Sequence, residues 1–178
     1  MTAPDEMPLL LRTVKQHRWH KEAAAPFLAN DDVPADPVQD LRTTKNLLSV
    51  YEVAPDGPNI ERIVRAVAIG GDNIANMGYV VFDSGLLPAA SIEIRESKGT
   101  TPDEGANAWH RDLVVSGNKL VALTKAILRH GESGAVLTVR LRQLVADGIR
   151  DGQIPEKLRK KFRFLTSETS GGNLEKQM

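Results

Sequence analysis

Four short apolar runs along the chain are typical of β-strands. Residues 9–14 open with three leucines, and residues 46–53 combine β-branched and aromatic side chains with partial alternation. Residues 79–82 are apolar on both faces, which is typical of a buried strand, whereas residues 91–95 alternate and predict one solvated face. These runs predict a small mixed or antiparallel sheet of three or four strands. Such a sheet is stable only when helices cover it.

Helical spacing dominates the later part of the chain. Residues 59–70, 116–130 and 136–150 carry apolar side chains three and four positions apart, which predicts three helices. We expect the last helix to bury Leu137, Leu141, Leu144 and Val145. Residues 25–41 contain three prolines and predict turns with at most a short helix. Because strands come first and helices follow, the sequence predicts an α+β fold with a helical C-terminal half.

Length and composition fit one globular domain. The chain has 178 residues, 41% of them hydrophobic and 26% charged. We expect a single domain over residues 8–165, with flexible termini at residues 1–7 and 166–178. The absence of cysteine excludes disulfides, thiolate zinc sites and cysteine nucleophiles. No apolar run approaches the roughly 20 residues that cross a bilayer, so we expect no membrane contact and a cytoplasmic location.

Charge is balanced overall but unevenly distributed. Residues 46–116 hold 5 basic and 10 acidic side chains, whereas residues 117–178 hold 12 basic and 6 acidic ones. Opposite charges of this kind either neutralise each other within the fold or face different partners. Self-association through complementary faces is one consequence that the sequence predicts.

The segment Trp109-His110-Arg111-Asp112 has two interpretations. The acids at Asp103 and Glu104 favour a helix start, and a helix over residues 103–114 would bury Trp109 in the core. Alternatively His110 serves as a general base, since its ordinary pKa lies near neutrality. No serine or cysteine nucleophile stands at a diagnostic spacing, so the structural interpretation is favoured.

The stretch "HRWH" places His17 and His20 three residues apart. Two histidines are too few for a zinc site, and we expect no metal here. Basic residues surround them, namely Arg12, Lys15, Arg18 and Lys21. In that setting Trp19 either stacks on a base or ring of a ligand or packs on the domain.

Asp83, Glu93 and Arg95 suggest a metal-dependent hydrolase as one alternative. An aspartate that ends one strand, followed by Glu-x-Arg on the next, resembles the Asp…Glu-x-Lys pattern of restriction-endonuclease-like nucleases. The resemblance implies that Asp83 and Glu93 hold magnesium. Arginine replaces the lysine of the pattern at position 95 and cannot give up a proton. A surface row of Glu93 and Arg95 explains the same residues.

The basic segment at residues 157–163 suggests nucleic-acid binding as a second alternative. Its cations would neutralise phosphates and its phenylalanines would stack on bases. The candidate contacts are Arg159, Lys160, Lys161 and Arg163, with Arg18 as a further cation. The same segment suits a helix that buries Leu158, Phe162 and Leu165 and leaves its cations in water.

The chain lacks phosphate-binding glycine loops, a nucleophile elbow and an HExxH motif, which lowers the case for an enzyme. We therefore expect a non-enzymatic binding or interaction module without a cofactor, an accessory subunit of a soluble bacterial multi-protein system. Its expected partner is another protein or a second copy of itself. Nucleic-acid binding and metal-dependent hydrolysis remain the alternatives.

Overall fold

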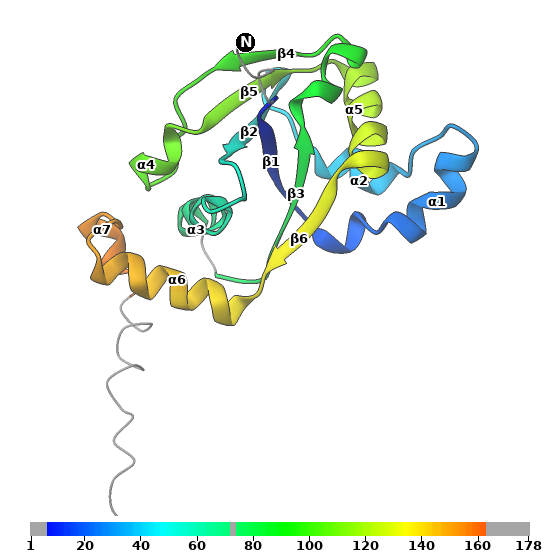
Figure 1. Ribbon diagram of the computed structural model, residues 1–178. Coiled ribbons are helices and arrows are strands. Elements are labelled where there is room, and N and C mark those ends of the chain that lie inside the picture. Colours follow the sequence, from blue (N-terminus) through cyan, green and yellow to red (C-terminus); the bar gives the residue numbers. More distant parts are fainter. Residues whose placement is uncertain (1–6, 72–73, 163–178) are drawn as a thin grey trace, which may run out of the picture.

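A single antiparallel sheet runs through the centre of the computed structural model, which describes residues 7–71 and 74–162 (Figure 1). Its strands are β1 (Leu9–Val14), β2 (Leu47–Val53), β3 (Met77–Asp83), β4 (Glu93–Glu96), β5 (His110–Val114) and β6 (Glu132–Val136). They lie in the order β4-β5-β2-β1-β3-β6, and every neighbouring pair is antiparallel. Strands β4 and β6 therefore form the two edges of the sheet.

Strand β1 supplies side chains to both halves of the core. Leu10 and Leu11 are adjacent in the chain and point to opposite faces of the sheet, yet each is 0% exposed. Leu11 lies between Tyr51 of β2 and Val81 of β3 in the register of the sheet. A strand that is apolar on both faces requires a helical layer on each side.

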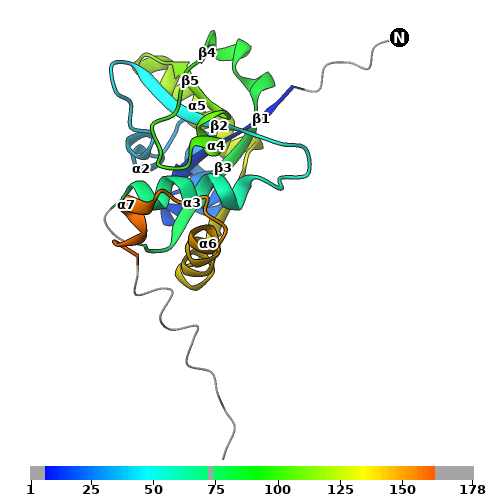
Figure 2. The ribbon, with the colours of Figure 1, turned by 90° about the vertical axis from the view of Figure 1, so that its left-hand side faces the viewer.

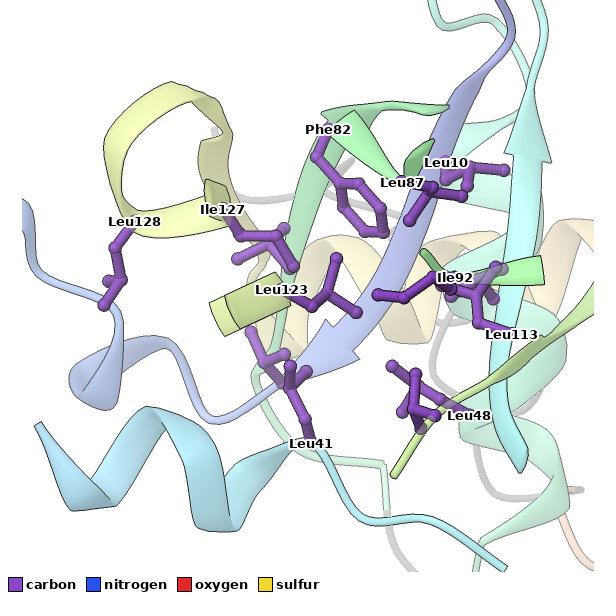
Figure 3. Packing of buried hydrophobic residues seen from close by; sticks show 14 of the residues in the cluster. Leu10, Leu41, Leu48, Phe82, Leu87, Ile92, Leu113, Leu123, Ile127 and Leu128 are labelled. Atoms are coloured by element: carbon purple, nitrogen blue, oxygen red, sulfur yellow. The ribbon is translucent and has the colours of Figure 1, made fainter. Parts of the chain in front are cut away.

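Helices α1 (Lys21–Ala29), α2 (Ala35–Asp40) and α5 (Gly117–His130) cover one face of the sheet, on the right of Figure 1. The core on this side is shown in part in Figure 3 and includes Leu10, Leu41, Leu48, Phe82, Leu87, Leu113, Leu123 and Ile127. Burying each large aliphatic side chain contributes about 1.5–3 kcal/mol to folding. This cluster is the largest apolar contribution to the fold.

Within residues 7–71 and 74–162, four helices lie on the opposite side, which Figure 2 turns toward the viewer. They are α3 (Ile60–Gly70), α4 (Glu104–Asn107), α6 (Thr138–Arg150) and α7 (Glu156–Arg159). Helix α3 packs Ile63 against Leu11 and Tyr51 of the sheet. Helix α6 packs Leu141 against Val64 of α3 and Val136 of β6. The sheet is thus enclosed between two helical layers.

The antiparallel sheet with its helices confirms the predicted α+β class, but the prediction of three or four strands was wrong. The first missed strand is β5, which lies in a segment predicted to be helical over residues 103–114. Helix α4 ends at Asn107, and Leu113 then pairs with Leu48 of β2 and is 0% exposed. Pairing with strands on both sides outweighs the local helical pattern.

The second missed strand is β6, whose sequence ESGAV has low strand propensity. Gly134 is required there, since a Cβ atom at this position would lie 2.5 Å from the ring of Tyr79 on β3. The glycine therefore allows the two strands to approach closely. Because β4, β5 and β6 all follow residue 90, the predicted helical C-terminal half is in fact mixed.

The helix predictions are largely confirmed. Helices α3 and α5 occupy the predicted ranges, and α6 begins two residues later than predicted, at Thr138. The proline-rich segment 25–41 is more helical than predicted, because α1 extends through Pro26 and α2 follows. Of the predicted flexible termini, only Met7 belongs to the described residues, and it is exposed.

Asp103, a buried carboxylate, joins the helices on the second side of the sheet. It is 1% exposed, and its two oxygens accept hydrogen bonds from Arg62 Nη2 at 2.8 Å and Arg62 Nε at 3.0 Å. Oδ2 also accepts one from Arg65 Nη2 at 2.9 Å. The backbone N–H of Ala106 donates to Oδ1, so Asp103 caps α4 as well. One side chain thus ties α4 to α3.

Arg65 extends this connection to α6. It is 5% exposed, and its Nη2 donates to Gln153 Oε1 at 2.7 Å, in the loop that follows α6. Gly148 of α6 makes room for the guanidinium, since a Cβ atom there would lie 2.7 Å from Arg65 Nη1. The carboxylate and the two arginines therefore hold α3, α4 and the C-terminal end of α6 together.

Burial opposes the ionisation of Asp103, but the hydrogen bonds from Arg62, Arg65 and Ala106 outweigh it and lower its pKa to about 2. A carboxylate with a depressed pKa stabilises the fold above its ordinary pKa of 3.8. That contribution is lost as the pH falls toward the folded value. The ion pair is therefore retained throughout the neutral range.

We predict that Asp103→Ala lowers the free energy of unfolding by about 3–5 kcal/mol at neutral pH, because it leaves two arginines without their buried partner. The difference between wild type and variant should shrink as the pH falls from the ordinary carboxyl pKa of 3.8 toward about 2. Urea unfolding followed by circular dichroism measures both effects. Asp36→Ala, at an exposed position of α2, is the control. If the difference in the free energy of unfolding between wild type and Asp103→Ala does not change over this pH range, the role assigned to Asp103 is contradicted.

Candidate functional site

Trp109 lies between α4 and β5, and His110 is the first residue of β5, so the two do not share a helix. Trp109 is partly buried against the Tyr51 and Ile63 cluster, and Arg62 Cζ lies 5.5 Å from its ring centroid. The side chain therefore packs beside the arginine that binds Asp103. This placement supports the structural interpretation of Trp109, although the predicted helical setting was wrong.

His110 is 7% exposed and is surrounded by polar groups. Its Nδ1 lies 2.8 Å from Ser97 Oγ, in the segment after β4, and its ring meets the Tyr51 ring edge-on at 5.2 Å. Its Nε2 lies 4.0 Å from Asp112 Oδ1, which accepts a hydrogen bond from Ser49. The structure thus brings a serine, a histidine and an aspartate together.

The electrostatics of this cluster favour a neutral imidazole. Burial lowers the pKa of His110, and the nearby Asp112 carboxylate offsets part of that effect. Asp112 is too far from Nε2 for a strong hydrogen bond. We interpret His110 as a packed connection between β5 and the segment after β4, with Ser97 as its partner.

Asp83 and Glu93, the candidate metal ligands, do not lie on adjacent strands. Asp83 ends β3 and Glu93 begins β4, and three strands separate them in the sheet. Asp83 accepts a hydrogen bond from the Gly85 N–H, while Glu93 pairs with Arg95 on the exposed surface. Among the described residues, no group of three or more histidines, aspartates and glutamates is arranged to hold a metal ion.

The cations of the basic C-terminal segment differ in their contacts. Arg159 turns back and donates to Ile154 O. Lys161 donates to Gly71 O, and both Lys160 and Lys161 are exposed. Phe162 is 2% exposed and packs in the core with Leu158. The predicted contact Arg163 and the predicted core residue Leu165 lie outside the described residues.

The "HRWH" stretch belongs to the other side of the sheet. Trp19 is 2% exposed and donates its indole N–H to Asp40 Oδ2 at 3.0 Å, so it is a core residue. His17 and His20 are both exposed. Arg18 lies in the short helix Gln16–Arg18, which packs against α2 and β6 rather than beside α7. Arg18 and α7 therefore do not form one nucleic-acid surface.

An apolar groove beside β6 was missed by sequence reasoning. It has a volume of about 560 Å³ and lies between α3, β3, β6 and α6, with Ile60, Tyr79, Val136, Leu137 and Val139 in its walls. We call it the β6 groove. Leu137 is 61% exposed and Val139 is 81% exposed, although Leu137 was predicted to be buried. An ion pair between Glu61 and Arg140 lies at its rim.

The fold defines this chain as an α+β protein with an antiparallel sheet between two helical layers. No protein-family model, curated protein or solved structure matches it. In the described parts of the chain, every helix is too short or too polar to cross a bilayer. The function must therefore be argued from the surfaces of the molecule.

We predict that His110 makes the stability of the fold depend on pH near neutrality. Because its folded pKa lies below the ordinary value of 6.5, the unfolded chain takes up this proton first as the pH falls. Wild type should lose stability as the pH drops through this region, and His110→Gln should lose less. Urea midpoints at several pH values test this, with the exposed His17→Gln as control. Parallel pH profiles for wild type and His110→Gln would contradict the assignment.

Proposed function

We propose that this protein is a non-enzymatic interaction module that docks a protein strand along β6 and the β6 groove. The supporting observation is the exposure of Leu137 and Val139, 61% and 81%, beside an apolar groove of about 560 Å³. Apolar side chains that gather at a hollow surface mark interaction sites more often than isolated ones do.

The two edges of the sheet differ in how they resist pairing. Edge strand β4 has the sequence EIRE, and its charged side chains discourage another strand from adding to it. Edge strand β6 has Ser133, Gly134 and Ala135 at its centre, which allow a second backbone to approach. An added strand along β6 would gain backbone hydrogen bonds, and the groove would receive its apolar side chains.

The occupant to which we commit is a second copy of this chain. Two β6 strands that pair antiparallel about Gly134 place Glu132 of each copy opposite Val136 of the other. Glu132 then lies near the first turn of the other copy's α6, where the helix dipole is positive. Continued by one residue, the same two-fold register places Leu137 of each copy opposite Gly131 of the other, so the exposed apolar side chains of each copy face the partner at the two ends of the paired strands. The proposed contact therefore combines a favourable interaction of Glu132 with a helix start and exposed apolar side chains at each end of the paired strands.

We predict that wild-type protein forms a dimer and that the double variant Leu137→Asp/Val139→Asp weakens its dimerisation at least about tenfold, because charge enters an apolar interface. The melting temperature of the variant monomer should stay close to that of wild type, since both side chains are exposed. Sedimentation equilibrium over a range of concentrations measures the association.

Val121→Asp is the matched control, because Val121 is 42% exposed on α5, on the other side of the sheet. It should leave the dimer intact. A wild-type protein that remains monomeric at every concentration contradicts self-association, and a dimer that survives the double substitution contradicts the location.

A further inference from the structure

Strands β1 and β2 separate at one end of the sheet. Their pairing covers Leu9–Leu11 and Tyr51–Val53 only, whereas β1 remains paired with β3 as far as Val14. Strand β2 meanwhile pairs with β5 from Leu47 onward. The C-terminal half of β1 and the N-terminal half of β2 therefore diverge in the middle of the sheet.

Arg12 lies in this gap. Its Nη1 donates to the carbonyl oxygen of Ser49 at 2.9 Å, and its Nη2 lies 3.4 Å from the carbonyl oxygen of Arg42. Its Nε is buried and has no hydrogen-bond partner. An unpaired N–H on a buried guanidinium carries a free-energy cost.

A pocket of about 650 Å³ opens beside Arg12, between the end of β1, the residues that follow it and the start of β3. We call it the Arg12 pocket. Its walls also carry Lys15, His17, Asp40 and Arg42. Three cations thus line the pocket with one carboxylate: Arg12 and Lys15 from the end of β1, and Arg42 from a segment 30 residues after Arg12.

The carboxylate does not neutralise the cations. Asp40 Oδ2 accepts hydrogen bonds from the Lys15 backbone N–H at 2.6 Å and from the Trp19 indole at 3.0 Å. Within the described residues, none of the ion pairs involves Arg12, Lys15 or Arg42, whereas Arg62 and Arg140 are paired with carboxylates. Burial lowers the pKa of Arg12, and the nearby Asp40 carboxylate opposes this shift without cancelling it. With three cations and one carboxylate in its walls, the pocket therefore carries a net positive charge.

We propose that the Arg12 pocket binds a phosphate group, carried by a small ligand or by a nucleic-acid strand. The guanidinium of Arg12 lines the pocket, and the exposed ammonium of Lys15 and guanidinium of Arg42 supply charge-assisted donors for a phosphate. The volume accommodates a group of nucleotide size. This site is separate from the β6 groove, and the proposal does not depend on self-association.

Isothermal titration of the full-length protein with pyrophosphate, adenosine monophosphate and a short single-stranded DNA tests the proposal, with chloride matching the ionic strength. We expect saturable binding of at least one of these probes. The double variant Lys15→Ala/Arg42→Ala should bind at least about tenfold more weakly, through loss of two charged donors. Both side chains are exposed, and the Arg42 carbonyl that contacts Arg12 is kept, so the fold should be retained.

Lys157→Ala/Lys160→Ala removes the same charge from exposed positions at α7 and is the matched control. It should bind as wild type does. Equal affinity for mononucleotide and DNA indicates a small ligand, and binding of DNA alone indicates a strand; both support the pocket. No saturable binding of any probe, or a loss confined to the α7 variant, would overturn the proposal.

Discussion

A buried carboxylate held by two arginines determines how the second helical layer is assembled. Asp103 is fully enclosed, so its charge is tolerated only because Arg62 and Arg65 surround it. Arg65 reaches the loop after α6, and Gly148 allows α6 to approach. The small residues near the arginines and the polar contacts of Asp103 are consequences of this one constraint. Without it, α4 would lose its charged connection to α3, and Arg65 would be buried between α3 and α6 without a carboxylate partner.

The position of α6 in turn shapes the surface on which the proposed function depends. The β6 groove exists because α6 starts directly after β6 and packs against α3. This arrangement leaves Leu137 and Val139 exposed to solvent. The charged side chains of β4 discourage strand pairing at one edge of the sheet, whereas the small residues of β6 leave the opposite edge accessible to another strand. The Arg12 pocket arises separately, where β1 and β2 diverge. The two surfaces therefore belong to different features of the sheet.

Local patterns were sufficient where an element's own residues decide its structure. Two examples are the apolar stripe along α3 and the apolar run of β1, whose side chains are buried on both faces of the sheet. Strands β5 and β6 could not be recognised, because their pairing partners and the Tyr79–Gly134 contact are distant in sequence. The Asp103 contacts were equally hidden, since "TPDEG" looks like a helix start and the α3 arginines like a solvated face. The cluster of cations around "HRWH" could have indicated the Arg12 pocket. The separation of β1 and β2 beside it could not be predicted from the sequence.

Amide hydrogen–deuterium exchange at low and high protein concentration tests the central claim, that β6 is the edge at which this protein associates. The account predicts that the amides of Glu132–Val136 exchange more slowly as concentration rises, while those of Glu93–Glu96 on the opposite edge do not change. Exchange at β6 that is independent of concentration, or slowing confined to β4, would contradict it.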